Sequence, residues 1–198
     1  NQTPGQIGRY LGLTGEVIQG MDAIYANLAD VYIPTSAIPD LLQVITQSTS
    51  PDIRIAIRDF ALQFHPASSI ENCMLAQHRS AIDHHFKTHR VDEVMASLAK
   101  DDSSFAISTL ATMNKRSPLM MAVTSEQLQR CQQKSVAECL RIERTMVRHC
   151  FKHGEVLEGV RALVVDKDNT PRWSPASMAE VDDALIASFF AEVWPYYA

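Results

Sequence analysis

Apolar residues recur at helical spacing along most of this chain. Val91, Val94, Met95 and Leu98 repeat at i, i+3, i+4 and i+7, which predicts an amphipathic helix that ends near Lys100. Similar stripes predict later helices on Ala106, Leu110 and Met113, on Cys139, Ile142, Met146 and Cys150, and on Met178, Val181, Leu185 and Phe189. The pattern is helical from residue 70 onward, so we expect this part of the chain to be a set of packed helices.

Capping signals divide that pattern into separate helices. Ser68-x-x-Glu71, Ser135-x-x-Glu138 and Ser177-x-x-Glu180 are capping boxes, in which the serine accepts from a backbone N–H and the glutamate reaches back. The first box predicts a helix that runs to about Phe86. Ser117-Pro118 marks another start, because serine can cap a helix and proline fits its first turn.

The first 64 residues follow a less regular pattern. Helices are predicted over Pro4–Leu13, over Gly20–Asn27, from Thr35 or Ser36 through Ile45, and over Ile53–Phe64. Between the second and third, Leu28–Ile33 is a β-branched and aromatic run stopped by Pro34, which predicts a strand. His65–Ser69 reads as a linker, so we expect a boundary between residues 1–64 and 65–198.

Near the C-terminal end, a charged turn follows a run of residues whose secondary structure is ambiguous. Gly159–Val165 is predicted as either helix or strand, because its aliphatic residues fit both periods. Asp166–Thr170 alternates carboxylates as a calcium loop does, but Pro171 stands where that loop needs glycine. We therefore interpret it as a solvated turn. From the residues alone, the expected fold is mainly α with one or two short strands.

Composition narrows the classes of partner. The formal net charge is -5, from 18 Lys+Arg against 23 Asp+Glu, which argues against a dedicated nucleic-acid binder. No apolar run approaches the roughly 18 residues of a membrane span, so a soluble chain without membrane contact is expected. Four cysteines without a CxxC pair predict reduced thiols in a cytosol-like compartment. No targeting signal is readable after Asn1.

Two other groups of residues were candidates for chemistry. His85-x-x-x-His89 has metal-ligand spacing, but no glutamate follows His85, so solvated surface histidines and no metal site are preferred. Arg141, Arg144, Arg148 and Lys152 form a basic stripe at helical spacing. The stripe could meet phosphates, although charge pairing on a solvent face explains most of it. Spacing alone predicts no catalytic constellation.

Two sets of segments carry a family resemblance. Gly8–Gly15 with Gly20–Pro34 resembles the helix, turn, helix and strand passage of the crotonase (enoyl-CoA hydratase/isomerase) superfamily. More specific segments are Val91–Val94, Asp102–Phe105, Met113–Pro118, Ala137–Leu140, Gly159–Asp168 and Pro171–Ala176. Together these resemble the C-terminal half of the 3-hydroxyisobutyryl-CoA hydrolase family within that superfamily.

The resemblance implies a fold and an activity. Residues 1–64 would be the end of the α/β crotonase (ββα spiral) core, and residues 65–198 its helical C-terminal region. The intact protein would be a thioesterase that releases 3-hydroxyisobutyrate from its CoA ester in valine breakdown. It would need no metal and no redox cofactor. CoA itself is part of the substrate and is not counted as a cofactor. Its compartment would be the cytoplasm, or the mitochondrial matrix in a eukaryote.

The resemblance also implies which residues take part. The family's oxyanion segments and catalytic carboxylates match no residue of this sequence, so no catalytic residue is assigned here. In related hydratases an aromatic residue and a lysine near the chain end touch the CoA nucleotide, and Leu163 and Lys167 are their nearest equivalents. We therefore expect Lys167, with Arg161, to bind substrate near the CoA phosphates. The expected partners are an acyl-CoA, an N-terminal half of the same protein and further copies of it.

Two alternatives stay open at this stage. The intact protein could catalyse another crotonase reaction, hydration or isomerisation of an enoyl-CoA. The chain could also be a non-catalytic helical module for interaction or oligomerisation, which acts only through packing.

Overall fold

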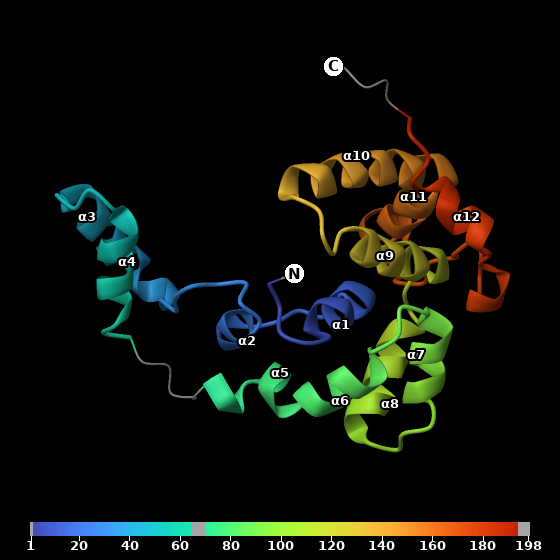
Figure 1. Ribbon diagram of the computed structural model, residues 1–198, viewed down its shortest axis with the longest axis horizontal. Coiled ribbons are helices and arrows are strands. Elements are labelled where there is room, and N and C mark those ends of the chain that lie inside the picture. Colours follow the sequence, from blue (N-terminus) through green and yellow to red (C-terminus); the bar gives the residue numbers. More distant parts are fainter. Residues whose placement is uncertain (1, 65–69, 194–198) are drawn as a thin grey trace. The chain divides into compact units, whose positions relative to one another are not determined.

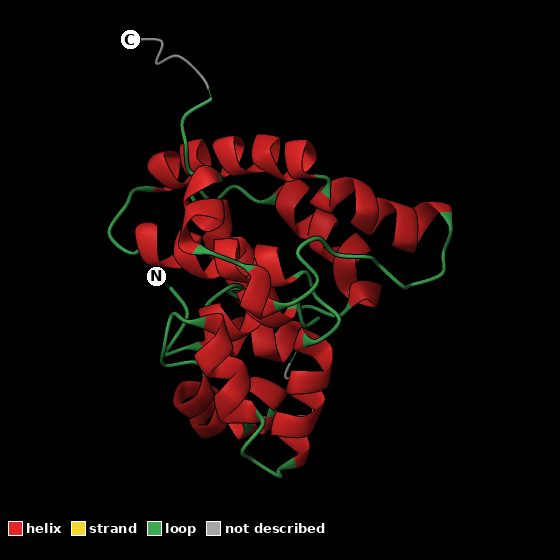
Figure 2. Ribbon diagram, turned by 90° about the vertical axis from the view of Figure 1, so that its right-hand side faces the viewer, coloured by secondary structure: helices red, strands yellow, loops and turns green. Residues whose placement is uncertain are grey.

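The computed structural model describes residues 2–64 and 70–193. Every regular element in these two ranges is helical (Figure 2). The chain divides into two compact units, the first made of residues 1–8 and 16–83 and the second of residues 9–15 and 84–198. Helix α1, Ile7–Thr14, passes from the first unit to the second. The predicted predominance of helix is confirmed.

The first unit contains short helices joined by turns (Figure 1). Its elements are α2 (Gly20–Tyr25), η1 (Thr35–Ala37), α3 (Ile38–Gln47), α4 (Ile53–Ala61), η2 (Ile70–Asn72), α5 (Met74–Gln77) and most of α6 (Arg79–His85). Helices α3 and α4 form a hairpin. Asp52 caps α4, because its Oδ1 accepts from the backbone N–H of Arg54 at 3.0 Å.

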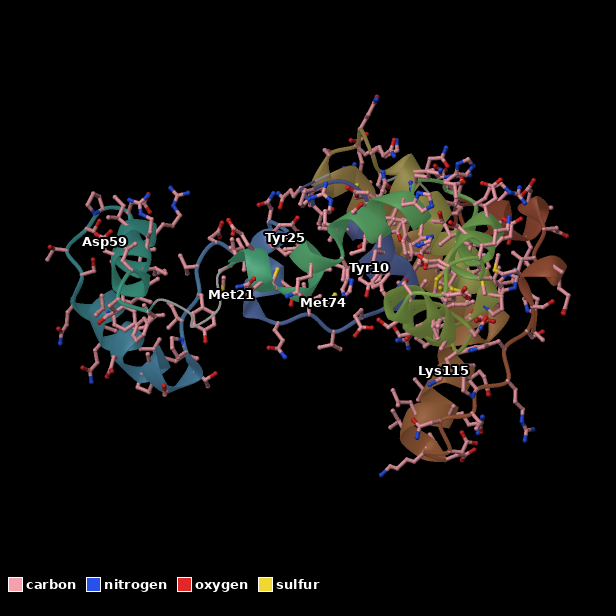
Figure 3. The ribbon with its side chains drawn as sticks, turned by 90° about the horizontal axis from the view of Figure 1, so that it is seen from below. Tyr10, Met21, Tyr25, Asp59, Met74 and Lys115 are labelled. Carbon is pink, nitrogen blue, oxygen red and sulfur yellow. The ribbon has the colours of Figure 1, made fainter. Side chains whose placement is uncertain are left out.

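A buried carboxylate joins α2 to α5 in the first unit. Asp22 is 6% exposed, and its Oδ1 accepts from the backbone N–H of Leu75 at 2.8 Å. Figure 3 labels Met21 and Tyr25 of α2 and Met74 of α5, the two helices that this contact joins. The carboxylate therefore satisfies a helix N-terminus that would otherwise be unpaired.

The second unit is larger and holds the C-terminal half of the chain. Its helices are α7 (Val91–Leu98), α8 (Ser104–Met113), α9 (Pro118–Arg130), α10 (Val136–His153), α11 (Glu155–Val160), η3 (Arg161–Val165, a π turn), η4 (Met178–Glu180) and α12 (Asp183–Ser188). Ser103 and Ser117 cap α8 and α9 by accepting from a backbone N–H three residues on.

One core cluster of the second unit lies between α9, α10 and the end of α12. Leu119, Val123, Met146, Cys150 and Phe189 are each at most 7% exposed and pack as one cluster. Burying one such side chain is worth about 1.5 to 3 kcal/mol. The cluster thus fixes the helix after which α11 and the charged turn begin.

Helix α10 forms as its sequence predicts. Ser135 accepts from the backbone N–H of Glu138 while the Glu138 carboxylate accepts from the Ser135 N–H, so the capping box is complete. The helix ends at Gly154, whose φ of +87° is the left-handed conformation that favours glycine. Both ends of the longest described helix are therefore set by local sequence.

The predicted strand at Leu28–Ile33 is wrong. Within the described ranges this segment is irregular, and no segment there pairs with it as a neighbouring strand. The N–H groups of Leu28 and Ala29 instead donate to the Ala23 carbonyl, at 2.8 and 3.2 Å. These bonds close the end of α2, so β propensity is overridden by the preceding helix.

Two other predicted helices differ from the structure. The helix expected up to Phe86 is split into η2, α5 and α6, because α5 starts afresh on the Asp22 carboxylate. At the third box the Ser177 hydroxyl donates to the Glu180 carboxylate at 2.7 Å, so it does not cap a backbone N–H. Only a three-residue 3-10 turn forms there, and α12 begins later, capped by Asp182.

Several predictions fall outside the described residues. These are the linker His65–Ser69, the serine of the first box, Ser68, and the aromatic residues Trp194, Tyr196 and Tyr197. The division at residues 64 and 65 also stays a prediction. Within the described residues no helix is both long and apolar enough to cross a membrane.

Candidate functional site

The charged turn after α11 is built on a change of helix type. Gly159–Val165 is helical, which settles the ambiguous periodicity, but the hydrogen bonding widens to a π turn over residues 161–165. The Asp166 N–H donates to the Arg161 carbonyl at 2.8 Å. Lys167 and Asn169 then take positive φ angles of 55° and 53°. The chain thus reverses tightly and returns its carboxylates towards the helix it has left.

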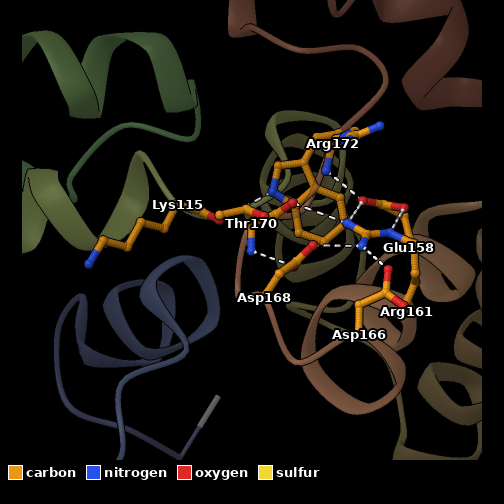
Figure 4. Close-up of polar contacts among 8 residues, drawn as sticks. Lys115, Glu158, Arg161, Asp166, Asp168, Thr170 and Arg172 are labelled. Atoms are coloured by element: carbon orange, nitrogen blue, oxygen red, sulfur yellow. Dashed lines mark hydrogen bonds and ion pairs between the residues drawn. The ribbon is translucent and has the colours of Figure 1, made fainter.

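Arg161 stands at the centre of this turn (Figure 4). Its Nε and one terminal nitrogen donate to both oxygens of Glu158, at 2.9 and 2.8 Å. The other terminal nitrogen donates to Asp166 at 2.5 Å and to Asp168 at 2.8 Å. A fifth bond runs to the Thr170 carbonyl at 3.1 Å. A guanidinium has five N–H donors, so this geometry engages all of them.

A backbone contact and an indole contact hold the segment that follows the turn. The Arg172 N–H donates to Glu158 at 2.6 Å, and the Trp173 indole N–H donates to the Lys115 carbonyl at 3.2 Å. The Lys115 side chain extends away from the carboxylates in Figure 4. The chain that follows the turn is therefore tied to α11 and to the loop after α8.

Two carboxylates of the turn are strongly acidic. The Arg161 guanidinium, helped by the Arg172 N–H, lowers the pKa of Glu158 to about 2. Arg161 and the Thr170 N–H likewise lower the pKa of Asp168 to about 2. The same pairs raise the pKa of Arg161. Glu158, Asp168 and Arg161 are therefore charged at neutral pH.

The two residues predicted to bind substrate lie in the same turn but differ in environment. The Arg161 side chain is 29% exposed and fully hydrogen-bonded. Lys167 is exposed, and within the described part of the chain no carboxylate forms an ion pair with its ammonium group. Contact of either residue with CoA stays a prediction. Of the two, Lys167 presents the accessible cation.

The prediction that His84, His85 and His89 are surface histidines is right for His84, which is exposed, and for His89, and wrong for His85. His89 is exposed, but His85 is 3% exposed and lies between the Ser97 hydroxyl, at 2.8 Å, and the Asp101 carboxylate, at 3.0 Å. Helical spacing could not reveal these partners, because Ser97 lies in the next helix, α7, and Asp101 lies in the turn that follows it. Among the described residues, no three His, Cys, Asp or Glu side chains group as metal ligands.

Two further candidate groups were the basic stripe of α10 and the cysteines. The four residues of the basic stripe are all exposed on α10, which agrees with a solvated face. Among the described residues, none of the four cysteines forms a disulfide. Neither group adds a reactive centre to the turn.

A family description matches almost the whole chain. The model for "Enoyl-CoA hydratase/isomerase" matches residues 1–190. The chain is 30% identical over 189 residues to the mitochondrial 3-hydroxyisobutyryl-CoA hydrolase of Gallus gallus, covering 94% of this chain and 49% of that protein. It is 31% identical over 193 residues to that of Xenopus tropicalis, covering 96% and 50%. The chain thus spans about half the length of the curated relatives it matches.

Solved structures show the same likeness in three dimensions. A carnitinyl-CoA dehydratase from Mycobacterium thermoresistibile superposes with a TM-score of 0.83 at 30% identity, covering 98% of this chain and 54% of that one. An enoyl-CoA hydratase from Rhodobacter sphaeroides 2.4.1 superposes with a TM-score of 0.80 at 32% identity, covering 97% and 53%. These likenesses agree with the helical C-terminal part of a crotonase fold.

Proposed function

The chain belongs to the enoyl-CoA hydratase/isomerase family, and on that premise we propose that it is the C-terminal portion of a 3-hydroxyisobutyryl-CoA hydrolase. The observation that carries this proposal is the match of 94% of the chain to relatives of that name. In the proposed reaction water adds to the thioester carbonyl and the C–S bond breaks, which yields the free hydroxy acid and the CoA thiol. The substrate belongs to valine breakdown.

This portion contributes binding and no catalytic group. We assign no catalytic residue to these 198 residues, and the catalytic carboxylates of the proposed enzyme come from the remainder of the same protein. Neither a metal nor a redox cofactor is invoked. The compartment we propose is the cytoplasm, or the mitochondrial matrix in a eukaryote; the relatives are named as mitochondrial, which supports the second.

Lys167 is the residue we propose for the CoA phosphates. Its ammonium is exposed and unpaired with any described carboxylate, and a phosphate oxygen would provide the anion it lacks. Arg161 serves the same function by holding the turn from which Lys167 projects. Its five bonds also offset part of the negative charge of Glu158, Asp166 and Asp168, which would otherwise repel a phosphate.

A second reaction is favoured by the solved structures. Both superposed proteins are named as a hydratase or a dehydratase, which act by adding or removing water at a carbon–carbon bond. The two reactions differ in their products, because hydrolysis releases free CoA whereas hydration leaves the thioester intact. Absence of both reactions would favour the helical interaction module.

The experiment compares the complete protein with these 198 residues alone. Each is incubated with 3-hydroxyisobutyryl-CoA and with crotonyl-CoA, and free CoA and hydrated thioester are separated by chromatography. We expect free CoA from the complete protein only. Turnover by the 198 residues alone would refute the assignment of catalysis to another part of the protein, and hydrated crotonyl-CoA without free CoA would establish the second reaction.

The role of Lys167 has its own test in the complete protein. Lys167→Ala should raise KM for 3-hydroxyisobutyryl-CoA about tenfold with kcat little changed, because one charge-assisted hydrogen bond is worth about 1.5 kcal/mol. The N-acetylcysteamine thioester lacks the nucleotide phosphates, so its KM should not change. Lys134→Ala, an exposed lysine between α9 and α10, is the matched control. Equal KM changes for both thioesters would refute a phosphate contact.

A further inference from the structure

The second unit contains a cavity that the proposed chemistry does not use. Its volume is about 670 Å³, within the range of pockets that hold small molecules. Apolar side chains from α9, from the helical segment after α10 and from the returning chain form much of its wall, among them Met120, Met121, Val156, Leu163 and Trp173. An apolar molecule would therefore gain from leaving water there.

A buried carboxyl group lies in the same wall. Glu155 is 5% exposed, and within the described part of the chain its Oε2 has no hydrogen-bond partner. Burial raises the pKa of Glu155, while hydrogen bonds to Ser117 and to the Ser174 backbone oppose that rise. A buried carboxyl oxygen without a partner is destabilising, so a ligand that donates to it would relieve that cost.

The charges around the cavity select a neutral ligand. Lys115 and Arg116 also line it and disfavour a cation. Glu155 disfavours an anion at the buried end. We propose that this cavity binds a neutral, largely apolar small molecule whose single N–H or O–H group donates to the Glu155 carboxyl. The cavity wall shares Leu163 with the stretch compared above with a CoA contact, but the ligand proposed here carries neither a thioester nor a phosphate, so the two proposals are tested separately.

A pair of probes that differ in one donor tests this proposal. Indole has a ring N–H, whereas benzofuran has nearly the same shape and no donor. Each is titrated into the complete protein, labelled with 13C at its methionine methyl groups. Indole should shift the signals of Met120 and Met121 to saturation and leave Met95 of α7 unchanged, since Met95 is not part of the cavity wall. Benzofuran should bind about tenfold more weakly.

Two variants separate recognition from simple partitioning. Glu155→Leu should bind indole and benzofuran equally, because the acceptor is gone. If loss of the Ser117 contact unfolds that variant, Leu163→Trp still tests the site. Leu163 is 67% exposed, so the fold tolerates a larger side chain there, and because Leu163 lines the cavity that side chain takes up part of its volume. Leu157→Trp, at a position 60% exposed on α11 and not in the wall, is the control.

Three results would overturn the proposal. The first is equal affinity of the unsubstituted chain for indole and benzofuran. The second is unchanged indole affinity in Leu163→Trp. The third is the lack of any saturable shift of Met120 and Met121 up to the solubility limit of indole.

Discussion

Replacing the central guanidinium of the charged turn tests whether Arg161 sets the pKa values of the carboxylates around it. Arg161→Gln keeps a side chain of similar reach but removes the positive charge and most of the five donors. Glu158 then loses two bonds, of 2.9 and 2.8 Å, and retains the Arg172 N–H at 2.6 Å. Asp168 loses one bond of 2.8 Å and retains the Thr170 N–H. Both carboxylates therefore become easier to protonate.

The size of this effect follows from the pKa of each carboxylate. Glu158 has a pKa of about 2, against an ordinary value of 4.5, and the guanidinium is the largest cause of the difference. Removing an opposite charge at contact distance typically raises a carboxyl pKa by roughly one to three pH units. We expect the pKa of Glu158 to rise to between about 3 and 4, because the Arg172 N–H keeps part of the shift.

The pH dependence of stability has a definite sign. A carboxylate whose pKa is lowered by folding stabilises the folded state above its unfolded pKa, and that contribution is lost as pH falls to its folded pKa. For Glu158 the window runs from about 4.5 down to about 2. The free energy of unfolding of the unsubstituted chain should therefore fall more steeply across this window than that of Arg161→Gln.

NMR titration of the side-chain carboxyl carbons measures these pKa values directly. Arg90→Gln is the control, because Arg90 pairs with Asp92 at 2.8 Å in an exposed ion pair elsewhere in the second unit. That variant should leave the pKa of Glu158 unchanged. If the pKa of Glu158 stays near 2 in Arg161→Gln, the backbone N–H of Arg172 alone sets it, and Arg161 does not hold the carboxylates of the turn electrostatically.

Three stability predictions concern the helices that support the turn. Leu119→Ala should lower the free energy of unfolding by about 3 kcal/mol in a urea titration, because Leu119 is 1% exposed in the core; a loss below about 1 kcal/mol would contradict its packing. Ser135→Ala should cost about 1 kcal/mol by removing the cap of α10, and circular dichroism should show earlier thermal loss of helix. Gly154→Ala should cost about 1 to 2 kcal/mol through its positive φ alone, because no heavy atom lies within 4 Å of the added methyl group. An unchanged melting temperature in either variant would contradict the corresponding helix end.

Features that depend on a few neighbouring residues could be predicted from the sequence. The cap of α10 needs only Ser135 and Glu138, and its end needs only Gly154, so pattern and structure agree there. The stripe on α7 is confirmed at Val91 and Val94, which are at most 3% exposed. In each case the bonds that decide the structure lie within one or two helical turns.

Features that depend on distant partners could not be predicted. Leu28–Ile33 has strand propensity, but the N–H groups of its first two residues donate to Ala23 of α2. His85 is buried because Ser97 and Asp101 reach it from the next helix and the turn that follows. Glu155 gave no signal at all, since a glutamate after a glycine is usually a solvated first-turn residue, and only the tertiary structure encloses it.

The charged turn lies between these two cases. Its clustered charges were visible in the sequence, and an ordinary α-helix would have paired Arg161 with Glu158 three residues away. The π turn and the positive φ of Lys167 bring Asp166 and Asp168 to the same guanidinium, which no periodicity indicates. Because every donor of Arg161 is then in use, a phosphate could bind it only by breaking one of those bonds. The same turn leaves Lys167 exposed, and the search for a CoA contact in this chain is therefore best directed at that lysine.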